Sequence, residues 1–447
     1  MSFIADQQTL TDLNLTGRYN THSIYNLFNK TVTEGGASLL DEMFQYPLVN
    51  ADEINQRGRV IRFFQEEARF PLSNNQVKAL EDYLSTKGEK LALNSYIHSG
   101  RSWLWRTLGI DDTYDNHRMV LLSSIGALNK LRVYFNNLLE KPTGELFDQR
   151  IGEICAAFND QRLGWLKEAG DIQNHSVLKL ARFDHCLRHT FYQQMQKLMK
   201  LLFELDVYIA VGKVASERGF QFATALHADD NLLVFEDLKH PALENGKGNG
   251  LALNSDRNVL FLTGANMAGK STFMKSVAIA VYLAHMGFPV AARQMRLSVR
   301  DGIFSSINVP DNLGQGYSHF YAEVLRVKQV ALEVRAGKKL LVIFDELFKG
   351  TNVKDAFDAT FSVTEAFSER RECLFVISTH IIEVGEVLQR QCNNILFSYL
   401  PTVMKGMTPT YTYKLEEGIT ADRHGMMILK NERIIESIEQ DREISIA

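Results

Sequence analysis

The sequence predicts a helical domain over residues 1–230 and an α/β domain over residues 231–447. Proline is sparse in the first half, since only three of the eight prolines precede residue 240. An Asn- and Gly-rich turn at residues 245–250 then interrupts the helical pattern. Beyond this turn, short apolar runs alternate with longer segments of helical pattern, which favours a largely parallel sheet with helices on both faces.

The length and composition describe an ordinary globular chain with more than one domain. A chain of 447 residues is too long for one compact core. Hydrophobic residues at 45% and charged residues at 23% exclude wholesale disorder and fibrous repeats. The net charge of −4 neither indicates nor excludes nucleic acid as a partner.

Several features favour a cytoplasmic protein with no contact to a membrane. The longest apolar run, Val277–Val290, is shorter than the roughly 20 residues of a membrane span and predicts a buried helix. The four cysteines form no CxxC pair, and the first ten residues show no signal pattern.

The first half contains a stretch of 41 residues, Asp171–Val211, without Gly or Pro. A continuous helix over this stretch would span roughly 60 Å. Apolar residues in its C-terminal part follow three- and four-residue steps and predict one buried stripe, formed by Leu198, Leu201, Leu202, Leu205 and Ile209. The basic residues of the stretch are either contacts for a DNA backbone or solvated surface charge: Arg182, Arg188, Lys197 and Lys200.

A phosphate-binding motif, G-x-x-x-x-G-K-S, follows the apolar run Val259–Leu262 and precedes a helical pattern. In such a loop the glycines let backbone N–H groups turn toward phosphate oxygens, and the next helix adds the positive end of its dipole. Lys270 supplies a charge for the outer phosphates, and Ser271 places a hydroxyl on Mg²⁺. The sequence therefore predicts a site for ATP and Mg²⁺. Its loop residues are Gly264, Ala265, Asn266, Met267, Ala268, Gly269, Lys270, Ser271 and Thr272.

Polar residues follow two further apolar runs. Asp345 and Glu346 come directly after Leu340–Phe344, where Asp345 can support the metal ion and Glu346 can polarise an attacking water. His380 follows the next apolar run, and at a strand end it can sense the terminal phosphate. This order predicts ATP hydrolysis, with Glu346, His380 and Lys270 as catalytic residues. Phosphate loops also serve metabolic kinases, but no other motif suggests an acceptor pocket.

With these motifs, the chain resembles the MutS family of DNA mismatch-repair ATPases over most of residues 20–430. The most specific similarities are residues 263–272 (TGANMAGKST), residues 345–351 (DELFKGT) and residues 378–380 (STH). The resemblance implies an ABC-class P-loop ATPase domain at the C-terminus, preceded by an all-α lever and core domain. Residues 75–175 leave room only for a reduced clamp.

The resemblance also implies roles for two residues outside these motifs. Tyr413 stands where a family aromatic packs on adenine, and Ser318 where a residue contacts the ATP of the opposite subunit. The implied assembly is a homodimer with two composite ATPase sites. Two alternatives stay open: Tyr413 is ordinary strand packing, and Ser318 caps the helix that starts at His319, since Ser is a favourable N-cap.

The sequence also departs from the family pattern. The lever-like segment starts by about residue 20, which leaves no room for mismatch-recognition and connector domains. Their Phe-x-Glu wedge is missing, because Phe64-Gln65-Glu66 has the letters but lies in a helical, lever-like context. These departures argue against direct recognition of mismatches. Phe348 and Lys349 stand where the family usually has Gly and Arg, and His319 where it has Thr, so turnover can differ.

From these features we expect an ATP-hydrolysing, DNA-binding protein of mismatch repair or related DNA-structure processing that works as a nucleotide-switched dimer. The alternative is an ATP-dependent switch that binds a protein partner rather than DNA. Salt dependence separates the two, because binding through several DNA phosphates weakens steeply as salt rises.

Overall fold

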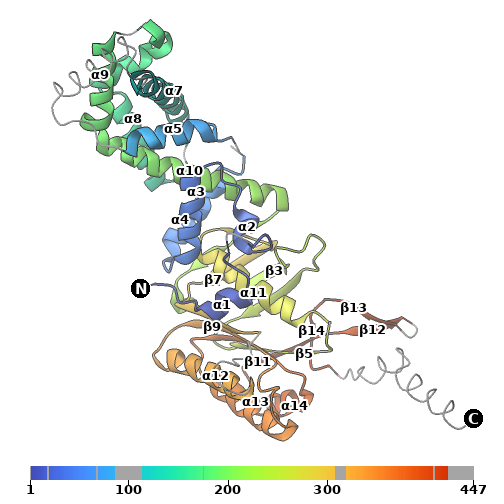
Figure 1. Cartoon of the computed structure of the whole chain (residues 1–447). Coiled ribbons are helices and arrows are strands. Elements are labelled where there is room, and N and C mark those ends of the chain that lie inside the picture. The colour runs from blue at the N-terminus through green and yellow to red at the C-terminus, as the bar shows by residue number, and fades with distance from the viewer. Residues whose placement is uncertain are drawn as a thin grey trace, which may run out of the picture. The chain divides into compact units, whose positions relative to one another are not determined.

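The computed structural model describes residues 2–17, 20–66, 69–85, 113–141, 143–174, 176–307, 319–405 and 408–420. Contacts within the chain define two compact units. The first unit comprises residues 1–27, 44–58 and 218–447, and the second comprises residues 28–43 and 59–217. Figure 1 shows helices alone in the described part of the second unit, whereas the first unit contains all the sheets.

The second unit is built from helices that run through most of its described residues. Their bounds are α3 (Glu34–Gln45), α4 (Ala51–Phe63), α5 (Asn74–Ser85), α7 (Thr113–Leu139), α8 (Glu145–Phe158), η1 (Gln161–Asn174), α9 (Val177–His185), η2 (Cys186–Thr190) and α10 (Tyr192–Arg218), with α3, α4 and α10 crossing into the first unit. The predicted apolar stripe of α10 is buried throughout, which confirms that prediction: Leu198, Leu201, Leu202, Leu205 and Ile209.

The stretch Asp171–Val211 is helical over nearly all of its described residues, but it is not one continuous α-helix. A 3₁₀ segment, the helix α9, a π turn and α10 succeed one another there. Next to the π turn, buried Asp184 accepts a hydrogen bond from the Tyr83 hydroxyl at 2.8 Å and two from Arg188 at 2.8 and 2.7 Å. Asp184 and Arg188 are four residues apart, a spacing that helices favour, so this pair supports the helical turn around it.

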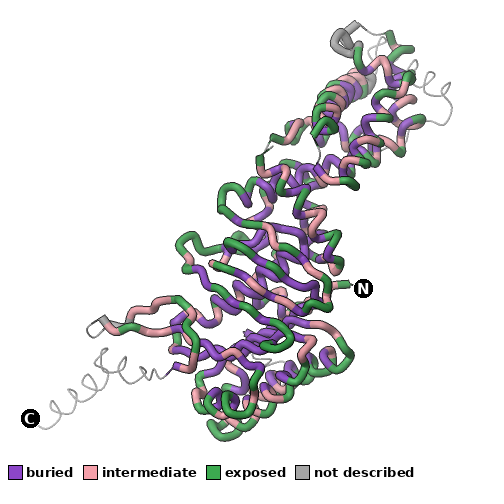
Figure 2. Tube along the Cα trace, turned by 180° about the vertical axis from the view of Figure 1, so that it is seen from behind, coloured by how far each residue is buried: buried purple, intermediate pink, exposed green. Residues whose placement is uncertain are grey.

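The main sheet of the first unit has six strands in the order β14-β11-β5-β10-β9-β8. Their bounds are β5 (Val259–Gly264), β8 (Gly302–Ser306), β9 (Leu340–Asp345), β10 (Leu374–Ser378), β11 (Ile395–Leu400) and β14 (Glu416–Glu417). All neighbours are parallel except β14, which is antiparallel to β11. Every residue of β5, β9 and β10 is buried (Figure 2), as expected of parallel strands with both faces covered.

Smaller sheets accompany the main one. A four-stranded sheet has the order β2-β7-β3-β4, and two strand pairs join β1 to β6 and β12 to β13. The bounds are β1 (Gln221–Phe222), β2 (Thr224–Leu226), β3 (Leu233–Leu238), β4 (Asn249–Leu253), β6 (Pro289–Val290), β7 (Gln294–Ser298), β12 (Thr402–Lys405) and β13 (Thr408–Tyr411), with a short turn of 3₁₀ helix at η3 (Ala228–Asp230).

Helices lie on both faces of the main sheet, as predicted. On one face, α11 (Lys270–His285) contacts β5 and β9 and also reaches β2 of the four-stranded sheet, so it is buried almost all round. On the other face lie α12 (His319–Arg335), α13 (Val353–Ser368) and α14 (Ile382–Gln391), as Figure 1 shows. The buried helix predicted at residues 277–290 is confirmed as far as His285, where α11 ends, but Pro289–Val290 form the strand β6 instead.

Residues from the start of the chain belong to the unit that contains the sheets, which differs from a simple division at residue 230. Ile4, ahead of α1 (Gln7–Asp12), pairs with β8: its N–H donates to Asp301 O at 2.8 Å, and its carbonyl accepts from Ile303 N at 2.8 Å. Asp12 accepts from the Ser305 hydroxyl at 2.9 Å. Pairing between residues about 300 positions apart leaves no local pattern, so the sequence analysis missed it. The short helix α2 (Ile24–Phe28) follows.

The C-terminal end of α11 is fastened to residues 44–58 of the same unit. The Tyr282 hydroxyl donates to Phe44 O, and His285 Nδ1 lies 2.7 Å from Leu48 O. On the other side of the ring, His285 Nε2 accepts from Arg300 N at 3.2 Å. His285 is fully buried, and desolvation lowers its pKa to about 4.

All four cysteines are free thiols. Among the described residues, no helix has both the length and the apolar character of a membrane span.

Candidate nucleotide site

The loop between β5 and α11 adopts a backbone that its glycines make possible. Gly264 ends β5 with φ 141°, and Gly269 caps α11 with φ 102°, both in a region that favours glycine. A Cβ on Gly264 would lie 3.1 Å from Leu400 O, so a larger residue also lacks space there. Met267 at the loop tip is 77% exposed. The loop therefore delivers the chain directly into the N-terminus of α11, where the helix dipole favours an anion.

Lys270 is the first residue of α11 and is buried, with 5% of its surface exposed. Its Nζ donates to Gly264 O at 2.8 Å and to Ala265 O at 3.2 Å. Desolvation lowers the pKa of Lys270, whereas the charges of Glu346 and Asp345 act to raise it. The ammonium group thus lies within the loop and within electrostatic range of both acids.

Asp345, Glu346 and His380 lie at the same edge of the sheet, because they lie at or just after the ends of the neighbouring strands β9 and β10. In the parallel register Ser378 of β10 pairs with both Asp345 of β9 and Leu262 of β5. The Ser378 hydroxyl donates to Asp345 Oδ1, and Ser378 O accepts from Glu346 N at 3.0 Å. Asp345, Glu346 and the residues after Ser378 therefore end next to the start of the loop.

Glu346 forms the central contact of this edge. His380 Nε2 lies 2.5 Å from its Oε1, and Lys349 Nζ lies 3.8 Å from its Oε2. The contact with His380 is the main reason that the pKa of Glu346 is lowered, opposed by its partial burial. Glu346 also has φ 57°, an uncommon left-handed conformation for this residue type. Such strain is typical of residues held for a function, and here the carboxylate is kept ionised.

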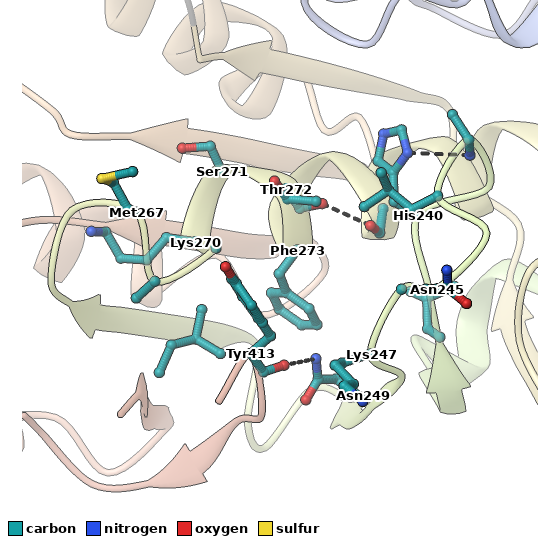
Figure 3. A pocket seen from close by; sticks show the side chains of 18 of the residues that line it. His240, Asn245, Lys247, Asn249, Met267, Lys270, Ser271, Thr272, Phe273 and Tyr413 are labelled. Atoms are coloured by element: carbon teal, nitrogen blue, oxygen red, sulfur yellow. Dashed lines mark hydrogen bonds between the residues drawn. The ribbon is translucent and has the colours of Figure 1, made fainter. Parts of the chain in front are cut away.

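A cavity of about 950 Å³ begins at the loop and extends past residues 238–249 (Figure 3). Loop residues 265–271, Glu346 and Tyr413 line it. Lys270 and Glu346 therefore face the same space. His240, at the far part of the cavity, has a lowered pKa because it is desolvated and because Lys275 is charged nearby.

Tyr413 lies against the loop rather than within a strand. It follows β13, which ends at Tyr411, and is 44% exposed. A Cβ added to Gly269 would lie 3.0 Å from Tyr413 Cδ1, so the ring occupies the space that this glycine leaves. Of the two interpretations from the sequence, ordinary strand packing therefore does not describe Tyr413.

Ser271 and Asp345 offer hard oxygen donors, a hydroxyl and a carboxylate, of the kind that Mg²⁺ binds. Ser271 lies in the first turn of α11 and is half-buried, and Asp345 is 9% exposed. No cluster of three or more His, Cys, Asp or Glu side chains suited to a metal occurs in the part of the chain that the structure describes. The two donors fit Mg²⁺ if water and phosphate oxygens complete its shell.

Other predicted features have mixed outcomes. Ser318 lies outside the described residues, so both of its roles stay predictions, and the described part of α12 starts at His319. Phe348, which replaces a family glycine, has φ 63° and is buried against Phe320, with ring centroids 5.9 Å apart. Asn249 and His240 also line the cavity. The sequence places Asn249 in the turn at residues 245–250, and His240 in a Lys-His-Pro segment that resembles the entry to the family's ATPase domain, but it assigns neither residue to the site.

The basic residues on the 171–211 stretch are partly engaged within their own unit. Arg188 is paired with Asp184, and Lys197 Nζ lies 3.0 Å from Glu153 Oε2. Arg188 is 18% exposed at its side chain, so it is not simple solvated charge.

Two family models match the chain, MutS domain III over residues 8–211 and MutS domain V over residues 260–444. The chain belongs to the MutS family. The domain V match includes the loop from Gly264, the Asp345-Glu346 pair and His380.

Curated relatives agree with this assignment. The DNA mismatch repair proteins MutS of Streptococcus pyogenes serotype M5 (strain Manfredo) and serotype M1 are each 28% identical over 254 residues. The match covers 55% of this chain and 29% of each relative. The chain thus spans less than a third of the length of these relatives.

Proposed function

We propose that the chain binds ATP with Mg²⁺ at the cavity and hydrolyses it, as an ABC-type P-loop ATPase. One observation carries the proposal: the buried Lys270 of the loop and the Glu346–His380 pair come together at one sheet edge, with Lys270 and Glu346 lining the same cavity. A charge for the phosphates and a fixed carboxylate for water are the two parts that hydrolysis of a phosphoanhydride needs.

The roles follow from these contacts. The loop N–H groups and α11 hold the phosphates, and Lys270 Nζ exchanges its bonds to the Gly264 and Ala265 carbonyls for phosphate oxygens. Ser271 and Asp345 hold Mg²⁺, which neutralises charge on the phosphate oxygens. Glu346 orients and polarises the attacking water.

His380 acts through Glu346 and through the terminal phosphate. Its contact at 2.5 Å keeps the Glu346 carboxylate ionised and aimed, and a phosphate beside it would compete for the same ring nitrogen. Tyr413 packs on adenine beside the phosphate loop, where its ring lies over Gly269.

We further propose that the protein works as a homodimer that binds DNA, in mismatch repair or related DNA-structure processing. Membership of the MutS family and the naming of its relatives as DNA mismatch repair proteins support this proposal. Ser318 of each subunit would contact the nucleotide of the other. ATP then shifts the population toward a closed dimer by binding that state more tightly. The comparisons lend no support to a protein partner in place of DNA.

Binding to fluorescent homoduplex, mismatched, branched and single-stranded DNA tests the proposal, with and without ATP. We expect a preference for at least one structure, a dependence on ATP and a steep loss of affinity between low and physiological salt. Light scattering should show a dimer in ATP. Equal, salt-insensitive binding to all four DNAs, or a monomer in every nucleotide state, would contradict the proposal.

A further inference from the structure

We infer that Asn249 is a positioning residue that holds Tyr413 as a platform for the nucleotide base, and that Lys414 assists it. This inference rests on the proposed binding of ATP. Asn249 lies outside the phosphate-binding motifs, and the inference makes it the residue that determines whether the nucleotide base contacts Tyr413.

Both the nitrogen and the oxygen of the Asn249 carboxamide form hydrogen bonds to one short backbone segment. It begins β4 and is buried, with 9% exposed. Its Nδ2 donates to Tyr413 O at 3.0 Å, and its Oδ1 accepts from Leu415 N at 2.8 Å. The dashed line between Tyr413 and Asn249 in Figure 3 marks the first of these bonds. The side chain thus spans Lys414 and fixes the backbone on either side of it.

Lys414 reinforces the same connection from the opposite direction. Its Nζ donates to Gly248 O, the residue before Asn249. Residues 248–249 and residues 413–415 are therefore joined by three hydrogen bonds that involve side chains from both segments. The segments come from distant parts of the sequence, and this joint brings them to one wall of the cavity.

The joint is needed because Tyr413 has an unfavourable backbone. Its φ is 55°, a left-handed conformation that an aromatic residue rarely adopts without support. Residues 412–415 lie between β13 and β14. Thr412 N still donates to Pro401 O at 3.4 Å, whereas the backbone from Tyr413 O to Leu415 N is held by Asn249. Bonds to the atoms on both sides of Lys414 select this conformation over an extended one.

The result of this conformation is the position of the Tyr413 ring. The ring lies against Gly269, at the N-terminus of α11, and it lines the cavity together with Asn249. With an extended backbone at residue 413, the ring would point in another direction and lose its contact with Gly269. Asn249 therefore governs whether a planar base finds an aromatic surface beside the phosphate loop.

This assignment predicts that substitution of Asn249 lowers the affinity contributed by the base but not the affinity contributed by the phosphates. Base stacking on an aromatic side chain contributes to affinity largely without regard to base identity. The phosphate contacts come from the loop and Lys270. Loss of Asn249 should therefore weaken ligands that contain a base and spare a ligand made of phosphates alone.

The test compares ATP with inorganic tripolyphosphate, each with Mg²⁺, as competitors of a fluorescent ATP analogue. Asn249→Ala should weaken ATP about tenfold. Tyr413→Ala should weaken it equally, and the double variant should be no weaker than either alone. Tripolyphosphate should bind all variants like the unaltered protein. Asn26→Ala, which removes another hydrogen-bonded asparagine of the same unit outside the cavity, is the matched control.

Two further variants distinguish an effect on the position of the Tyr413 ring from an effect on folding. Tyr413→Phe keeps the ring and should bind ATP nearly normally. Lys414→Met should weaken ATP less than Asn249→Ala and in the same selective way, and it replaces Asn249→Ala if that variant does not fold.

The outcomes also separate this inference from the proposed function. Normal ATP affinity of a folded Asn249→Ala, or an additive double variant, would overturn the role of Asn249 while leaving ATP binding intact. Equal weakening of ATP and tripolyphosphate would overturn it too, because the residue would then act on the loop. If the unaltered protein binds neither ligand, the proposed function fails and this inference falls with it.

Discussion

His380 and Glu346 meet at 2.5 Å between Nε2 and Oε1, across the ends of two neighbouring parallel strands. The second oxygen of the same carboxylate faces Lys349 at 3.8 Å. Both oxygens of Glu346 are therefore near a nitrogen, and the residue's left-handed backbone holds it there. This geometry suits a carboxylate that orients water more than one that must take up a proton readily.

Glu346→Gln should retain ATP binding and lower the rate of hydrolysis by about 100-fold or more. The amide keeps the size of the side chain but cannot polarise water as a carboxylate does. Single-turnover phosphate release measures the rate, and competition with a fluorescent analogue measures binding. Glu365→Gln on α13 serves as a control of the same chemistry. Normal hydrolysis by the Glu346 variant would remove this residue from the reaction.

Replacing His380 should change the pH dependence of hydrolysis. The contact with His380 lowers the pKa of Glu346, so the carboxylate stays ionised further into the acid range. In His380→Ala that pKa rises toward its ordinary value, and the acid limb of the kcat profile moves to higher pH. Lys349→Met should move it in the same direction by less, because Lys349 is a smaller cause of the shift. An acid limb that stays in place would contradict this link.

Lys270→Ala should weaken ATP binding about 100-fold or more, since several charged hydrogen bonds to phosphate are lost together. The protein should nevertheless unfold at the same or a higher temperature, because a buried ammonium group is costly to desolvate. Lys354→Met, an exposed lysine on α13, is the control. A lower melting temperature with unchanged ATP affinity would show that Lys270 serves the fold rather than phosphate.

At position 348 a glycine variant should be more stable than an alanine variant, the reverse of the usual order of stability. Phe348→Ala removes a buried ring and costs about 3–5 kcal/mol. Phe348→Gly removes the same ring but relieves a φ of 63°, so it should be about 1 kcal/mol more stable than the alanine variant. In the interior of α13, Ala356→Gly should show the ordinary order and destabilise by about 1 kcal/mol. Denaturant unfolding compares the variants, and an alanine variant more stable than the glycine one would contradict the strain.

His285 should make the stability of its unit fall in mild acid. Its pKa is about 4 in the fold and about 6.5 when unfolded, so the unfolded chain binds the extra proton between these values. Stability is therefore full above about pH 6.5 and declines toward pH 4, by about 3 kcal/mol in total. Calorimetric melting at a series of pH values measures this decline.

The matched substitutions for this effect are His285→Gln and His22→Gln. His285→Gln should be less stable at neutral pH, since it loses contacts with Leu48 O and Arg300 N, but it should show a shallower decline in acid. The exposed His22 should leave the decline unchanged when replaced. An equally steep decline in both variants would assign the acid sensitivity to other groups.

The central elements around the site were predictable because their sequence patterns are local. Three buried parallel strands are continuous apolar runs, and the polar residues that follow them reach one sheet edge by topology alone. Glu346 and His380 could therefore be expected near Lys270, although only the structure shows the contact between them. The buried stripe of α10 was predictable for the same reason.

Some of the features that were missed depend on segments far apart in the chain. Residues 171–211 combine the end of a 3₁₀ segment, α9, a π turn and α10 rather than one regular α-helix, and the absence of Gly and Pro does not reveal these irregularities. Asn249 carries no motif, and its importance comes from the backbone of residues 413–415. Resemblance to a family indicated Tyr413 but not what holds it in position.

The backbone hydrogen bonds of Ile4 beside β8 protect the protein against aggregation. β8 is the outermost strand of the main sheet, and a bare outermost strand offers unpaired backbone groups to a strand of another molecule. Ile4 takes up two of these groups, at Asp301 and Ile303. A change that removes the contact of Ile4 would therefore expose this edge of the sheet to pairing between molecules and favour aggregation.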